Sequence, residues 1–251
     1  MLYTLCGSLP PINCYFLEPP ARERAGKFTI PSSSSPSAGL IHIGLDEHPY
    51  ARSGYSLYIP ESWDGSSPLP LVVALHGGFS HGRDFIWTWL REARSRRFML
   101  AAPSSRGITW SITGPDFDSV LLHDMLNHIR ERWTMDAERI LLTGLSDGAT
   151  YALTRSLDER SPFTAYAVVS GILPPFSLRH AGGKRVYWVH GARDWMFPIW
   201  QAKTGYKLLT EAGADVTQVI LPDLYHAYPR EQNDAILTWF DPSLALPPPQ
   251  V

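Results

Sequence analysis

The segment RILLTGLSDGATYALTRSL, residues 139–157, begins with an apolar run, turns at two glycines and continues as a sequence able to form a helix. Ser146 lies between Gly144 and Gly148 in the pattern G-x-S-x-G. A serine hydroxyl becomes an effective nucleophile when a tight strand-to-helix turn exposes it and a base removes its proton. A surface turn could have the same local sequence, so the interpretation of Ser146 as a nucleophile depends on the rest of the chain.

Short apolar runs recur along the chain and end in Gly, Ser, Pro or Asp. They are LPLVVALHGG (69–78), FMLAAPSS (98–105), RILLTGLSDG (139–148), AYAVVSG (165–171), RVYWVHGARD (185–194) and VTQVILPD (216–223). Apolar residues on consecutive positions indicate strands that are buried on both faces of a parallel sheet. Helical periodicity lies between and after the runs, at 119–133, 201–213 and 231–240. This alternation predicts an α/β fold, a mostly parallel central sheet flanked by helices, with YSLYIP (55–60) as an antiparallel edge strand.

The first 40 residues have a different texture, with Pro pairs and the run IPSSSSPSAG. We predict an irregular N-terminal arm at 1–40 and one domain at 41–251, a length that suits a single large α/β unit. Cys6 and Cys14 both lie in the arm, outside any CxxC or Cys/His cluster. We therefore expect free thiols, or a disulfide if the protein is exported, but no metal site.

The composition excludes several classes of partner. A formal net charge of −2 with 18% charged residues provides no basic field to hold nucleic acid or an anionic membrane. No apolar stretch approaches the roughly 18 residues that a membrane span needs. The opening MLYTLCGSLPPINCYFLEPP also lacks the basic start and apolar centre of a signal peptide. We expect a cytoplasmic protein without nucleic-acid or membrane partners.

A base and an acid for Ser146 are found at the ends of later apolar runs. His226 follows the last run and precedes the last helical segment, in the chain order Ser, acid, His that such a site has on this architecture. Asp194 follows the run before it, where its carboxylate could orient the imidazole. Asp223 is the competing acid, but it lies only three residues before His226 and would have to bend back within one short loop. We favour Asp194.

The loop LHGGFS (75–80) follows the first run and is predicted to stabilise a developing oxyanion. Backbone N–H groups that point at such an oxygen lower the barrier to attack on an ester. One donor is expected from the residue after the nucleophile, Asp147, and the other from Gly78, with Phe79 as the alternative. We expect the Asp147 side chain in the first turn of the following helix, where a negative charge is favoured, so that an Asn replacement keeps much of the activity. His76 and His190 are interpreted as structural.

The motifs LHGG (75–78), GLSDG (144–148), HGARDWMFP (190–198) and LYHAYP (224–229), in this order, resemble those of an α/β-hydrolase. More narrowly, they resemble the small esterases grouped with phospholipase/carboxylesterases and polyhydroxybutyrate-depolymerase-like or feruloyl-esterase-like proteins. The resemblance spans about residues 50–241. It implies a catalytic triad of Ser146, Asp194 and His226, an oxyanion hole of the Gly78 and Asp147 amides, and neither metal nor organic cofactor. Only ILPPFSLRHAGGK (172–184) stands where larger relatives carry a lid, so no large lid domain is expected.

The predicted function is that of a serine carboxylesterase that acts on small-molecule esters with short-chain or aryl groups. Aromatic residues near the strand ends are candidates for substrate binding: Trp87, Trp110, Trp195, Phe197 and Trp200. Each could instead be part of the core. The alternatives are a thioesterase or small peptidase of the same fold, and a binding protein that kept the fold without the chemistry.

Overall fold

The computed structural model describes residues 38–44, 51–155, 157–174 and 178–246. Most of the predicted arm, with both cysteines, lies outside these residues, and the division into arm and domain stays a prediction. The described chain forms one eight-stranded sheet in the order β1-β2-β4-β3-β5-β6-β7-β8. The strands are β1 (Gly39–Ile43), β2 (Tyr55–Ile59), β3 (Leu69–Leu75), β4 (Met99–Pro103), β5 (Met135–Leu145), β6 (Ala165–Val169), β7 (Arg185–Gly191) and β8 (Asp215–Leu221).

The predicted mostly parallel sheet is confirmed, with one correction at its edge. β2 is antiparallel to β4, as predicted, but β1 pairs along its other side, from Gly39 opposite Ile59 to Ile43 opposite Tyr55. The interpretation of YSLYIP as an edge strand was therefore wrong. The short GLIHI strand beyond it carries a weaker signal, because it follows a Ser/Pro-rich stretch and is only five residues long.

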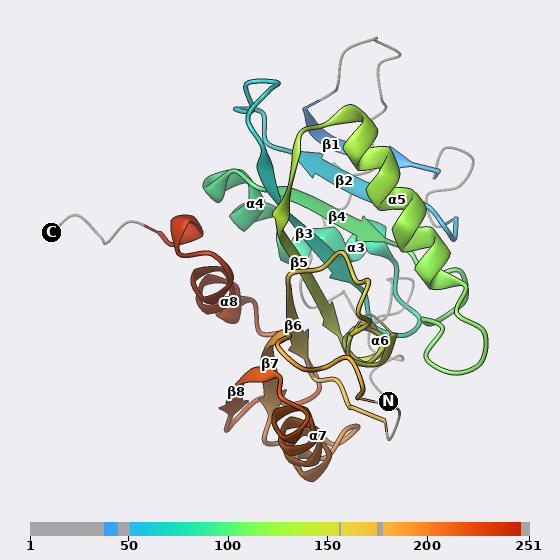
Figure 1. Ribbon diagram of the computed structural model, residues 1–251, viewed down its shortest axis with the longest axis vertical. Helices are drawn as coiled ribbons and strands as arrows, with labels where there is room; N and C mark the ends of the chain where they lie inside the picture. The colour runs from blue at the N-terminus through green and yellow to red at the C-terminus, as the bar shows by residue number, and fades with distance from the viewer. Residues whose placement is uncertain (1–37, 45–50, 156, 175–177, 247–251) are drawn as a thin grey trace, which may run out of the picture.

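Helices cover both faces of the sheet (Figure 1). One face carries α5 (Asp118–Arg132), α6 (Asp147–Arg155) and α7 (Ile199–Glu211), whose buried side chains join one apolar cluster. The other face carries α3 (Gly82–Phe85), α4 (Leu90–Arg96) and α8 (Asn233–Phe240), which pack into a second cluster. Short 3-10 turns complete the chain: η1 (Ile86–Thr88), η2 (Arg230–Gln232) and η3 (Pro242–Leu244). Alternate residues of the central strands enter the two clusters, which explains their consecutive apolar sequence.

The parallel strands bring six loops to one edge of the sheet. β3 to β8 are parallel neighbours, so their carboxyl ends lie at the same edge, and the loops that follow them meet there. Ser146, Asp194 and His226 follow β5, β7 and β8 respectively. The connection from β6 to β7 contains no helix among its described residues, in line with the absence of a large lid domain.

Candidate active site

Ser146 lies on a tight turn between β5 and α6. Its φ is +54°, in the left-handed region that side chains other than glycine rarely adopt. A Cβ on Gly144 would lie 2.7 Å from the carbonyl carbon of Gly148, and one on Gly148 would lie 2.5 Å from the carbonyl oxygen of His76. Both distances are shorter than the van der Waals contact distance of two non-bonded atoms. Neither position can therefore carry a Cβ unless the backbone moves, and close packing requires glycine at both. The turn holds Ser146 at the carboxyl edge of the sheet.

Ser146, His226 and Asp194 form one hydrogen-bonded chain. The Ser146 Oγ lies 2.9 Å from His226 Nε2, and Asp194 Oδ2 lies 2.8 Å from His226 Nδ1. Because the carboxylate only accepts, Nδ1 carries the proton, and Nε2 is then the acceptor for the serine hydroxyl. In this tautomer the imidazole is placed to take the Ser146 proton.

Asp194 is held by donors on both of its oxygens. Oδ2 accepts the bond from His226, and Oδ1 accepts from the backbone amides of Met196 at 3.0 Å and Phe197 at 2.8 Å. Burial by itself would raise the pKa of Asp194, but the hydrogen bonds from His226 and the Phe197 amide hold that pKa below its usual range. The carboxylate therefore stays ionised and oriented toward the imidazole.

Asp223, the competing acid, lies elsewhere. Its exposed carboxylate pairs with Arg193 at 2.7 Å. The hydrogen bond from His226 Nδ1 goes to Asp194 although 32 residues separate the two. In the structure, His226 therefore pairs with Asp194 and not with Asp223, and the catalytic role of Asp194 stays a prediction.

Two buried histidines support the loops around Ser146. His190 donates from Nε2 to the Phe197 carbonyl at 2.8 Å and lies 3.6 Å from Asp194 Oδ2, and burial lowers the pKa of this histidine. His76 donates from Nδ1 to the Gly77 carbonyl at 2.7 Å and accepts the Ser105 amide at Nε2 at 3.0 Å. Burial lowers the pKa of His76 to about 3. Both side chains are neutral at pH 7 and have the structural contacts expected of them.

The loop that is predicted to stabilise an oxyanion follows β3. The Phe79 amide donates to the Ile108 carbonyl at 2.7 Å, so the alternative donor is already engaged. No hydrogen bond from the amides of Gly78 and Asp147 to another described residue is found, which leaves both able to serve a ligand. Asp147 is the first residue of α6, as expected. Its carboxylate, however, also accepts a hydrogen bond from the Thr109 hydroxyl, a contact that the sequence did not indicate.

The aromatic candidates divide into exposed and buried groups. Trp195 is 60% exposed and Trp200 is 63% exposed, and the Phe197 ring meets the His226 ring edge-on at 5.1 Å between centroids. Trp110 is only 2% exposed, and its indole N–H donates to the His76 carbonyl at 2.7 Å. Trp87 is half-buried against the apolar cluster under α4 and α8. Trp110 is therefore part of the core, whereas substrate contact by the half-buried Trp87 stays a prediction.

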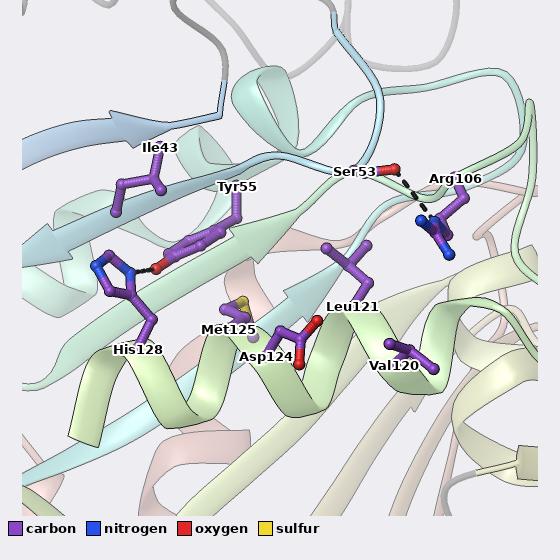
Figure 2. A pocket seen from close by; sticks show the side chains of 9 residues that line it. All are labelled: Ile43, Ser53, Tyr55, Arg106, Val120, Leu121, Asp124, Met125 and His128. Carbon is purple, nitrogen blue, oxygen red and sulfur yellow. Dashed lines mark hydrogen bonds between the residues drawn. The ribbon is translucent and has the colours of Figure 1, made fainter. Parts of the chain in front are cut away.

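A hollow away from Ser146 lies between β1, β2 and α5 (Figure 2). It has a volume of about 410 Å³. Figure 2 shows Tyr55 pointing to His128, to which it is hydrogen-bonded, and Arg106 hydrogen-bonded to Ser53. None of its lining residues belongs to the chain of hydrogen bonds from Ser146 to Asp194.

Part of the sequence matches a known protein family. Residues 119–241, which include Ser146, Asp194 and His226, match the phospholipase/carboxylesterase family. The protein has the α/β-hydrolase fold, and the matched residues resemble an esterase-like family. No curated protein matches the sequence of this α/β-hydrolase. In its described part, no helix is long and apolar enough to cross a membrane, and no three side chains group as metal ligands would.

Solved structures share the fold of this α/β-hydrolase at low sequence identity. Acetyl xylan esterase from Aspergillus awamori is similar with a TM-score of 0.65 and 15% identity, over 81% of this chain and 99% of that one. A thermostable esterase is similar with a TM-score of 0.59 and 18% identity, over 76% of this chain and 56% of the other. An acylaminoacyl peptidase from Pyrococcus horikoshii has a TM-score of 0.62 and 17% identity, over 79% of this chain and 41% of that one. The α/β-hydrolase thus spans little more than half of the thermostable esterase and less than half of the peptidase.

Proposed function

We propose that this α/β-hydrolase is a serine carboxylesterase with Ser146 as nucleophile, His226 as general base and Asp194 as the acid that orients His226. The observation that carries the proposal is the continuous set of hydrogen bonds from Ser146 Oγ through His226 to Asp194 Oδ2, at 2.9 and 2.8 Å. The two distances lie in the range that proton transfer needs, before any substrate is bound.

In the first half of the reaction, His226 Nε2 takes the Ser146 proton while Oγ attacks the ester carbonyl. The carbonyl oxygen becomes negative and accepts hydrogen bonds from the Gly78 and Asp147 amides. The bond from carbon to the leaving oxygen then breaks, and His226 gives its proton to the departing alcohol. Ser146 is left as an ester of the acyl group.

In the second half, water replaces the alcohol. His226 takes a proton from the water, whose oxygen attacks the acyl carbon and forms a second oxyanion at the same two amides. The bond from carbon to Ser146 Oγ breaks, Oγ regains the proton from His226, and the carboxylic acid leaves. Asp194 stays ionised throughout and stabilises the imidazolium, which fits the hydrogen bonds that keep its pKa low.

The surroundings of Ser146 favour uncharged esters with an aryl or short acyl group. Large apolar side chains are exposed on the loops after β3, β4, β7 and β8 and in the first turn of α7: Phe79, Ile108, Trp195, Met196, Trp200 and Tyr225. Exposed apolar surface gathered at one edge is a feature of binding sites, and aromatic rings bind other rings by stacking. The nearby Arg193 is already paired with Asp223, so it does not favour an anionic substrate.

Hydrolysis of p-nitrophenyl esters from acetate to palmitate, alongside methyl ferulate, tests the proposal. We expect turnover that is highest with short chains, measurable turnover of ferulate, and loss of about 10⁴-fold or more in Ser146→Ala. A fluorophosphonate should label the wild-type protein and leave Ser146→Ala unlabelled. Preference for a thioester or an anilide of the same acyl group would favour a thioesterase or a peptidase. Failure of the wild-type protein to react with any of these would favour a binding protein.

A further inference from the structure

The side chain of Asp147 connects three segments around Ser146. Asp147 itself follows the serine, and its Oδ2 accepts a hydrogen bond from the hydroxyl of Thr109, in the loop after β4. A Cβ placed on Gly78, in the loop after β3, would overlap the same Oδ2 and lie 3.3 Å from Asp147 Cγ. The carboxylate therefore lies directly against the α-carbon of Gly78.

This contact explains why a glycine stands at position 78. Gly78 is not among the residues whose φ lies in the left-handed region, so its backbone conformation is open to other residues. What a larger side chain would meet is the Asp147 carboxylate, with Thr109 Oγ1 next at 3.8 Å. The Asp147 carboxylate thus occupies the space that a side chain at position 78 would need.

The two loops that meet here are both strained. Ser146 has a φ of +54° and Phe79 a φ of +60°, conformations that persist only where neighbouring contacts hold them. Ile108 and Thr109 are adjacent residues of the loop after β4. Ile108 bonds the loop that contains Phe79, and Thr109 bonds the residue that follows Ser146. The Ile108 carbonyl accepts the Phe79 amide at 2.7 Å, and the Thr109 hydroxyl donates to Asp147. The loop after β4 thus ties the Gly78 segment to the Ser146 turn.

We propose that the Asp147 carboxylate is a positioning residue for the oxyanion hole. Bonded to Thr109 and packed on Gly78, it fixes the distance between the Gly78 and Asp147 amides, which come from different loops. The inference rests on the proposed esterase function. Donors must lie about 2.7–3.1 Å from the oxyanion, so loops that move apart would lose one of the two bonds. A negative charge beside a developing oxyanion is unfavourable in itself, so the benefit of this side chain is its position.

Steady-state kinetics with p-nitrophenyl acetate on three single variants and one double variant test the proposal. Asp147→Ala removes the contact, and we expect kcat to fall about 100-fold, near the loss of one oxyanion donor, while KM changes less than about threefold. Asp147→Asn keeps an acceptor for Thr109 and should restore kcat at least about tenfold above Asp147→Ala. Thr109→Val should lower kcat about tenfold, and adding it to Asp147→Ala should lower kcat no further, because both changes remove one interaction.

A boronic acid that forms a tetrahedral adduct gives a second readout. Its affinity should fall with kcat/KM in Asp147→Ala, whereas a merely structural role would leave the two unrelated. Asp124→Ala, which removes an exposed carboxylate on α5, is the matched control and should leave kcat unchanged. Thermal unfolding establishes that each variant is folded, and Thr109→Val carries the test if Asp147→Ala is not.

Three results would overturn the inference: a kcat for Asp147→Ala within about twofold of wild type, additive losses in the double variant, or a change in KM alone. A change in KM alone would indicate that the Asp147 carboxylate contacts the substrate. The outcome for the proposed function is separate. An active, fluorophosphonate-reactive wild type with an insensitive Asp147→Ala refutes only the positioning role, whereas an inert wild type refutes both.

Discussion

His76 should make the folded protein lose stability as the pH falls below 6.5. Burial lowers the pKa of His76 from about 6.5 to about 3, because the charged imidazolium is disfavoured at a fully buried position. At pH 7 the imidazole is neutral in both the folded and unfolded chains and contributes nothing. Below pH 6.5 the unfolded chain binds a proton that the folded chain does not, so the free energy of unfolding decreases.

The size of this effect follows from the pKa difference. At about 1.4 kcal/mol for each pH unit, His76 lowers the free energy of unfolding by about 2 kcal/mol at pH 5. The loss continues to about pH 3, where it reaches about 5 kcal/mol and levels off. His81, whose pKa burial lowers to about 4, acts in the same direction. Protonation of these two histidines, which lie on either side of Gly78, should therefore destabilise the folded protein at low pH.

Urea unfolding followed by circular dichroism at pH 7 and pH 5 measures the effect. In His76→Gln, whose amide can replace both hydrogen bonds, the loss of stability between the two pH values should be about 2 kcal/mol smaller than in wild type. His123→Gln, on the exposed face of α5, is the control and should behave as wild type. An unchanged loss in His76→Gln would refute the reasoning. If that variant does not fold, the wild-type protein can be titrated by NMR instead. A pKa near 6 for His76 would then refute the reasoning.

Two further substitutions test the turn at Ser146 and its acid. Gly148→Ala should lower the free energy of unfolding by about 3 kcal/mol, because the new Cβ would lie 2.5 Å from the His76 carbonyl oxygen and 2.6 Å from that of Leu75. Gly182→Ala, whose nearest atom is 3.6 Å away, should change it by less than about 0.5 kcal/mol in the same urea titration, and equal effects would contradict the steric argument. Asp194→Asn should lower kcat about 10⁴-fold on p-nitrophenyl acetate by favouring the wrong tautomer of His226. Asp223→Asn, in an exposed pair with Arg193, should leave kcat within about twofold, and the reverse result would exchange the two roles.

The sequence predicted β2, the six parallel strands and the set of loops that meet at one edge of the sheet. Consecutive apolar runs such as those around β3 and β5 are local signals, because a strand buried on both faces needs apolar residues at every position. Parallel strands also place their following loops at one edge whatever the loops contain. For that reason the chain order of Ser146, Asp194 and His226 could be read before any contact was known.

The sequence did not predict contacts between segments that lie far apart in the chain. Trp110 was a candidate for substrate contact, but its ring packs on His76 with 4.9 Å between centroids and on Tyr151. Nothing in its neighbouring residues distinguishes a core tryptophan from an exposed one such as Trp195. β1 was missed for a related reason, since five residues after a Ser/Pro-rich stretch become a strand only because β2 offers an unpaired side.

By itself, the sequence determined the α/β-hydrolase fold, the turn at Ser146 and the short list of acids and bases, because these depend on patterns within single segments. Only the tertiary structure decided that His226 bonds Asp194 and not Asp223, that Phe79 is engaged by Ile108, and that the Asp147 carboxylate meets Thr109 and Gly78. Each of these contacts joins loops that follow different strands. Their distances depend on strand order, register and the backbone angles of residues such as Ser146, which no local pattern contains.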